Sequence, residues 1–401
     1  MSRPARKWGE MSDSSASRAD VVILLGSRRA AISLAPLIRV MTASERWNVT
    51  VLTTGGPPRH LARTLESLDV VAAEDLGVEI SGLSQDELIR HAIERSHEVI
   101  DRRAPSALVL EGASTMTLGA ALAAFYLGVV VAHVTSTQVA SPLRSPIFSV
   151  NARLIAQLAR LHFVPNVAVS TSLLHQGANP NDVVIVGAPA VDNLRWVLRN
   201  KPGRSQFSTT NRRVLVVLRQ SETITAPLDI VTRVCAQLSR DVDVEVVLPL
   251  QHRLLVRSVI EGRLGSRPRV RLTGDLDYRD YVATLESADV VVSDSLAVQA
   301  EAQSLHKPCV IVPDDFLDDE LDAQSQGDVR AEAAYRECRR LLDDDEHRDA
   351  AVRASGTGLG GIASNSMELR LRTEVMARHD ATREATRRTA LQEKDVVGGV
   401  T

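Results

Sequence analysis

The sequence has few aromatic residues, few cysteines and no long apolar run, and each absence excludes a class of protein. Aromatic residues form 3% of the 401 residues, too few for a surface that stacks nucleic-acid bases. The cysteines, Cys235, Cys309 and Cys338, are odd in number and widely spaced, which predicts no disulfide framework, no metal site and a reducing, cytoplasmic location. No stretch of ~18 apolar residues occurs, and the N-terminus lacks a signal-peptide core, so we expect no membrane partner.

Charge and length set further limits. The net charge is −3, and no large basic block lies outside the tails, so nucleic acid is not an expected partner. Hydrophobic residues make up 44% and charged residues 24%, as in ordinary globular proteins. A chain of this length is too long for one core and predicts two domains of roughly 150–200 residues.

Strand and helix patterns alternate along most of the chain and predict its domains. The first unit comprises an apolar strand from Val21, a glycine turn, a helix over Ala30–Met41 and a strand over Asn48–Thr54. Later, Ser84 with Glu87 forms a capping box that starts a helix. The predicted boundaries are a disordered leader at 1–18, a Rossmann-like domain at 19–200, a linker at 201–213, a nucleotide-binding Rossmann-like domain at 214–363, a terminal helix at 364–380 that packs back on the first domain, and a flexible tail at 381–401.

The stretch from Ala288 to Val312 is the most informative part of the sequence. A β-branched run ends at Ser293-Asp-Ser295, and a helical pattern and a second apolar run follow. Ligands of parallel α/β sheets bind beyond the carboxyl ends of strands. Ser295 would begin the helix, with backbone N–H groups facing outward, which predicts an anion site.

Strands and helices alternate in both halves of the chain. This pattern predicts an α/β fold of two doubly wound parallel sheets in a GT-B arrangement, with a ligand cleft between them. Two motifs carry a family resemblance. They are Leu25-Gly-Ser-Arg-Arg-Ala-Ala-Ile-Ser-Leu-Ala-Pro-Leu37 and the stretch from Ser293 to Pro308. The first resembles Phe-Gly-Thr-Arg-Pro-Glu-Ala-Ile-Lys-Met-Ala-Pro-Leu, and the second resembles Thr-Asp-Ser-Gly-Gly-Ile-Gln-Glu-Glu-Ala-Pro-Ser-Leu-Gly-Lys-Pro, both of the non-hydrolysing UDP-N-acetylglucosamine 2-epimerases.

The resemblance implies a set of nucleotide-binding residues, and no cofactor or metal is expected. Arg28 matches the arginine of the first turn, Ser295 the phosphate-contacting serine, Glu301 the acid that holds the ribose hydroxyls, and Tyr281 an aromatic position near the base. Arg219 stands where the family has a histidine and would add positive charge to the cleft. The expected partner is a UDP-sugar or a related nucleotide, and the family implies that the chain can form a homodimer.

The family inverts the C2 centre of the sugar by eliminating UDP and adding it back, which requires acids and bases. Several of these positions differ here, because the family's aspartate is Ala113 and its glutamate is Thr135. Glu111 and His133, each at a strand end, are the remaining candidates for proton transfer. The simpler interpretation is that Glu111 is a turn carboxylate and that His133 is a structural histidine.

Three hypotheses about function follow from this pattern. The leading one is a family member that binds a nucleotide-sugar and has altered chemistry in a specialised pathway rather than the ordinary epimerisation. The alternatives are a catalytically silent binding or partner subunit and a GT-B sugar transferase.

Overall fold

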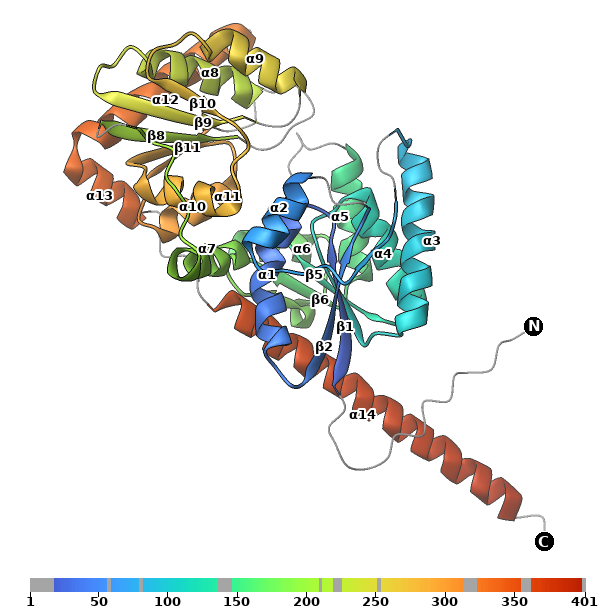
Figure 1. The fold of residues 1–401 in the computed structure, drawn as a ribbon. Coiled ribbons are helices and arrows are strands. Elements are labelled where there is room, and N and C mark those ends of the chain that lie inside the picture. The colour runs from blue at the N-terminus through green and yellow to red at the C-terminus, as the bar shows by residue number, and fades with distance from the viewer. Residues whose placement is uncertain are drawn as a thin grey trace.

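The chain folds into two parallel α/β domains joined through helices, as a computed structural model describes it (Figure 1). The described residues are 18–55, 59–78, 82–135, 146–208, 211–218, 226–250, 254–312, 323–354 and 362–398. Each domain contains one parallel sheet with helices on both faces. The predicted fold class is therefore confirmed.

The first sheet has seven parallel strands, and chain order reverses direction next to its central strand. This doubly wound order places the carboxyl ends of the central strands on one edge. In spatial order the strands are β3 (Glu74–Asp75), β2 (Trp47–Thr53), β1 (Ala19–Leu25), β4 (Ala107–Glu111), β5 (Val130–Val134), β6 (Leu161–Val164) and β7 (Val183–Ile185).

The second sheet repeats this order with five parallel strands. Its central strands are β-branched and almost fully buried, as expected for a sheet covered on both faces. In spatial order the strands are β10 (Val270–Thr273), β9 (Val244–Pro249), β8 (Arg212–Val217), β11 (Val290–Ser293) and β12 (Cys309–Ile311).

Two groups of helices cover the opposite faces of the first sheet, because alternate residues of each strand point to opposite sides. In β1, Val21, Ile23 and Leu25 belong to one apolar cluster, and Val22 and Leu24 belong to another. The helices on the first side are α1 (Arg28–Thr42), α2 (Arg59–Ser67), α7 (Pro189–Asn200) and α14 (Ala363–Gly398); those on the second are α3 (Gln85–Arg103), α4 (Thr115–Tyr126), α5 (Pro146–Leu158) and α6 (Val167–His175). A short 3-10 helix, η1 (Pro180–Asp182), precedes β7.

The helices of the second domain also separate into two groups, and one group joins the domains. The far side of the second sheet carries α8 (Ala226–Leu238), α9 (Leu254–Leu264), α12 (Ala323–Asp343) and α13 (Asp345–Ala354). The near side carries α10 (Tyr278–Ser287) and α11 (Leu296–Ser304). Residues Leu215 and Val247 of the second sheet share one apolar cluster with Leu194 of α7 and Ile23 of the first sheet. The core is therefore continuous across the junction.

The terminal helix α14 lies against the first domain. The Trp47 Nε1–H group donates to Glu368 at 2.8 Å, and the Arg160 Nε–H group donates to Glu374 at 2.9 Å. At the start of the helix, the Ser364 hydroxyl donates to Asp192 of α7 at 2.6 Å. The helix continues to Gly398, beyond the predicted end at 380 and through most of the segment predicted as a tail, because no glycine or proline interrupts its helix-forming sequence.

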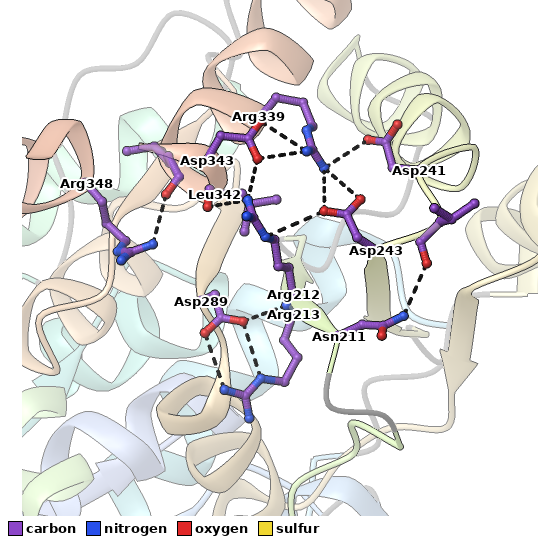
Figure 2. A network of polar contacts seen from close by, with 12 residues as sticks. Asn211, Arg212, Arg213, Asp241, Asp243, Asp289, Arg339, Leu342, Asp343 and Arg348 are labelled. Carbon is purple, nitrogen blue, oxygen red and sulfur yellow. Dashed lines mark hydrogen bonds and ion pairs between the residues drawn. The ribbon is translucent and has the colours of Figure 1, made fainter. Parts of the chain in front are cut away.

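A network of arginines and aspartates connects the amino ends of the second sheet to α12 (Figure 2). Arg339 of α12 contacts Asp243 at 3.2 Å, and Arg213 of β8 contacts Asp289 at 3.3 Å. Arg212, placed in the linker by the sequence, is the first residue of β8 and forms an ion pair with Asp343. Partial burial tends to raise the pKa of Asp243, but the hydrogen bond and charge of Arg339 dominate and lower this pKa. The network anchors the strand beginnings at the edge opposite the candidate site.

Five elements have no counterpart in the sequence-based prediction: α2, β3, η1, α7 and α13. Strand β3 has only two residues, too few for a periodic pattern. The four helices lie in segments for which the sequence predicts no helix. The leader, up to residue 17, lies outside the described residues.

The close approach of α3 and α4 generates a stability prediction. A Cβ atom at Gly119 would lie 2.4 Å from the Ala92 Cβ, whereas one at Gly262 of α9 would meet no atom within 4 Å. Gly119→Ala should lower the free energy of unfolding by about 1–3 kcal/mol because the helices must separate. Gly262→Ala should raise it by about 0.5–1 kcal/mol. Urea unfolding of both variants tests this pair, and equal shifts would contradict the assigned helix packing.

Candidate functional site

The carboxyl edges of the two sheets meet at Arg28, the first residue of α1. Ser27 caps this helix by accepting a hydrogen bond from the Ala30 N–H group at 3.1 Å, which places Arg28 directly beyond β1. Its guanidinium crosses to the loop after β10, where it contacts the Asp275 carboxylate at 2.9 Å and donates to the Leu276 carbonyl oxygen at 2.6 Å. The Arg28 Nε atom is buried and has no hydrogen-bond partner in the part of the chain that the structure describes.

The Glu301 carboxylate of α11 is the centre of this junction. Only 6% of the residue is exposed. The Tyr278 hydroxyl donates to its Oε1 atom at 2.9 Å, and the Tyr281 hydroxyl donates to its Oε2 atom at 2.6 Å. Both tyrosines lie on the same face of α10, three residues apart. The predicted site residues Tyr281 and Glu301 are therefore in direct contact.

Burial controls the electrostatics of this group. It raises the pKa of Glu301, while the hydrogen bonds from Tyr281 and Tyr278 and the charges of Arg29 and Arg28 act in the opposite direction. Burial and the nearby Glu301 also raise the pKa values of both tyrosines well above the usual range. The tyrosine hydroxyls therefore remain protonated and act as donors. Each oxygen of the Glu301 carboxylate has a second lone pair. A further hydrogen-bond donor can therefore bind to Glu301 once it reaches the carboxylate.

Ser295 stands immediately before α11 as its N-cap residue. The Ser293 hydroxyl donates to the Val217 carbonyl oxygen at 2.7 Å, and the Ser295 N–H group donates to the Ser293 hydroxyl oxygen at 3.1 Å. These bonds hold the turn against the end of β8. The Ser295 side chain makes no capping hydrogen bond and is 4% exposed. The first N–H groups of a helix have no partner within it, and here they lie at the carboxyl edge of the second sheet.

Glu111 and His133 lie on the neighbouring strands β4 and β5 of the first sheet. Both are buried, with 6% and 2% exposed. The His133 Nε2–H group donates to the Gly112 carbonyl oxygen at 2.8 Å, which leaves Nδ1 to accept from the Thr135 hydroxyl at 3.3 Å. Burial, with a smaller contribution from His162, lowers the pKa of His133 to about 4. The imidazole is therefore neutral at pH 7, with both nitrogens engaged.

The structure also identifies residues that sequence reasoning did not single out. Tyr278 shares Glu301 with Tyr281, and its position three residues earlier on the same helix was the available signal. Asp275 pairs with Arg28 across the junction, a contact that no local pattern indicates. Arg219 lies outside the described residues.

Among the described residues, no group of three or more histidine, cysteine, aspartate or glutamate side chains has the arrangement of a metal site. No helix in the same part of the chain is long and apolar enough to cross a bilayer.

Two doubly wound parallel domains whose carboxyl edges face each other define the GT-B class of fold. The family model described as UDP-N-acetylglucosamine 2-epimerase matches residues 39–355. The chain therefore belongs to the UDP-N-acetylglucosamine 2-epimerase family, as the sequence motifs predicted.

Individual relatives match almost along their full length. A Ralstonia solanacearum protein named "Probable UDP-N-acetylglucosamine 2-epimerase" is 27% identical over 364 residues, which cover 86% of this chain and 96% of the relative. The Neisseria meningitidis UDP-GlcNAc 2-epimerase, solved bound to UDP-GlcNAc, has a TM-score of 0.76 at 21% identity, covering 88% of this chain and all of that one. The S. aureus MnaA–UDP co-structure has a TM-score of 0.76 at 22% identity, with coverages of 89% and 97%.

The buried His133 generates a pH prediction. Its pKa is about 4 in the folded chain and about 6.5 when unfolded, so between these values only the unfolded state takes up the proton. The free energy of unfolding should therefore fall by about 3 kcal/mol as the pH decreases from 6.5 to 4.

Urea unfolding at several pH values measures this effect. His133→Gln should flatten the pH dependence, whereas His97→Gln, at an exposed position on α3, should retain it. A His133→Gln profile parallel to that of the wild type would contradict the assignment.

Proposed function

We propose that the protein binds a UDP-sugar or a related nucleotide between the carboxyl edges of its two sheets. One observation carries this proposal: Arg28 and Arg29 of the first domain lie near Glu301 of the second domain. Glu301 belongs to α11, the helix that Ser295 precedes as its N-cap residue. The start of α11 would hold the diphosphate, because its dipole and N–H groups favour anions. Relatives solved with UDP-GlcNAc and with UDP support the choice of ligand.

Glu301 would contact the ribose hydroxyls. A carboxylate accepts hydrogen bonds from two vicinal hydroxyls well, and its two oxygens already accept from Tyr278 and Tyr281. Because only 6% of Glu301 is exposed, the ribose must displace at least one tyrosine hydroxyl or reach a remaining lone pair. Arg28 would hold the first domain against the loop that precedes these tyrosines.

We further infer that ordinary C2 epimerisation is absent or very slow. The motif resemblance aligns Ala113 and Thr135 with the family's aspartate and glutamate, and both residues are buried. Alanine transfers no proton, and the Thr135 hydroxyl is in contact with the His133 ring. Because its pKa is about 4, His133 is neutral at pH 7 and is a poor general acid, and its one N–H group already donates to the Gly112 carbonyl oxygen. Glu111 is the carboxyl group on β4 that could still transfer a proton in an altered reaction.

Calorimetry with UDP tests the binding proposal. Glu301→Gln keeps the size of the side chain but removes its charge, and it should weaken UDP binding about tenfold or more, because hydrogen bonds to charged groups contribute about 1.5–3 kcal/mol. Glu245→Gln is the matched control, because Glu245 is also buried in the second domain but binds Ser208 near the opposite edge. Its UDP affinity should equal that of the wild type.

The ribose contact has a more specific test. UDP lacking both ribose hydroxyls should bind the wild type more weakly than UDP does, and this difference should largely disappear in Glu301→Gln. A wild type that does not bind UDP would refute the proposal as a whole. Equal UDP affinities for the wild type and Glu301→Gln would refute the role of Glu301.

Hydrogen exchange at C2 tests the chemistry. In D₂O with UDP-N-acetylglucosamine, we expect no deuterium at C2 under conditions where the Neisseria meningitidis enzyme incorporates it. Loss of a single acid or base lowers a rate by about 10²–10⁴-fold. NMR or mass spectrometry of the sugar provides the measurement. Incorporation together with the mannosamine epimer would refute the inference.

A further inference from the structure

A pocket of about 450 Å³ lies apart from the candidate site, where α1, α7 and the start of α14 meet. Its wall includes Asn200, the last residue of α7 before the chain enters the second domain, and Ser364, at the start of α14 after the chain returns. The pocket therefore lies at both crossings between the domains. The rest of its lining has three arginines, one aspartate, one indole and the apolar side chains of Pro36, Val40 and Ala43.

The charge of this pocket is strongly positive. Arg39, Arg195 and Arg199 line it, against the single carboxylate of Asp192. Asp192 already accepts hydrogen bonds from the backbone N–H and the hydroxyl of Ser364, at 2.9 and 2.6 Å. Arg199 is exposed, and no hydrogen bond or ion pair joins its side chain to another described residue. The pocket thus presents more positive than negative charge.

One of these arginines is held rigidly in place. The Arg39 guanidinium lies 4.0 Å from the centre of the Trp196 ring, and it donates to the Leu68 carbonyl oxygen at 3.1 Å and to the Asn193 side-chain oxygen at 2.6 Å. Burial lowers the pKa of Arg39 to about 10, and the charge of Asp69 opposes this effect. Asn193 is fully buried, and its Nδ2 atom has no hydrogen-bond partner among the described residues, which is costly for a buried amide. Arg39 is still cationic at pH 7 and lines the pocket.

We propose that this pocket binds a small phosphorylated anion. Arginine guanidinium groups match phosphate oxygens in charge and geometry, and the volume lies in the range of small-molecule sites. The anion would connect α1, α7 and α14 at the crossings. Because α7 also packs against the second domain in the shared apolar cluster, occupancy would stabilise one arrangement of the two domains. This proposal does not depend on the nucleotide function.

Calorimetric titration of the full-length protein with inorganic pyrophosphate tests it. Arg199→Ala should weaken binding about tenfold, because a charge-assisted hydrogen bond contributes at least about 1.5 kcal/mol. Arg240→Ala is the control: it removes the same charge from an exposed position at the end of α8 and should leave the affinity unchanged. Saturating UDP, added to occupy the candidate nucleotide site, should leave the Arg199-dependent binding in place.

Two outcomes would overturn the proposal. The first is equal pyrophosphate affinity in the wild type and Arg199→Ala. The second is an equal loss in Arg199→Ala and Arg240→Ala, which would indicate general electrostatic attraction. If UDP fails to bind, the comparison of the two variants without nucleotide still decides the question, so failure of the proposed function is distinguishable from failure of this inference.

Discussion

Burial of the Glu301 carboxylate beneath two tyrosine hydroxyls determines how helices α10 and α11 meet at the domain junction. An ionised group withdrawn from water requires donors or opposite charges, and here Tyr278 and Tyr281 supply the donors. The nearby charges of Arg29 and Arg28 also favour the ionised form. The orientation of α10, and with it the loop that Arg28 reaches, depends on satisfying this one carboxylate.

The same junction combines mechanical and chemical roles. One apolar cluster continues from the first sheet through α7 into the second, so the domains are packed together as well as linked by chain crossings. Arg28 adds a polar bridge at the edge where a nucleotide would enter. A ligand at Glu301 therefore has to alter contacts that also position the domains, which couples binding to domain arrangement.

Much of the fold was predictable because parallel strands are apolar and helices are amphipathic. The first predicted unit appears as β1, α1 and β2, whose bounds lie within two residues of the predicted ones. Helix α7 was missed although its buried residues Val191, Leu194 and Val197 have helical spacing. The extension of α14 was missed because a charged composition was interpreted as a tail, whereas its residues are good helix formers.

The two alternating α/β halves, the turn at Ser295 and the family membership can all be read from the amino-acid sequence. These properties arise from periodicity and local motifs, which depend on neighbouring residues. The pairing of Arg28 with Asp275, the enclosure of Glu301 by two tyrosines and the neutrality of His133 are visible only in the folded chain. Those properties depend on burial and on contacts between residues far apart in the chain, so they exist only once the two domains have packed together.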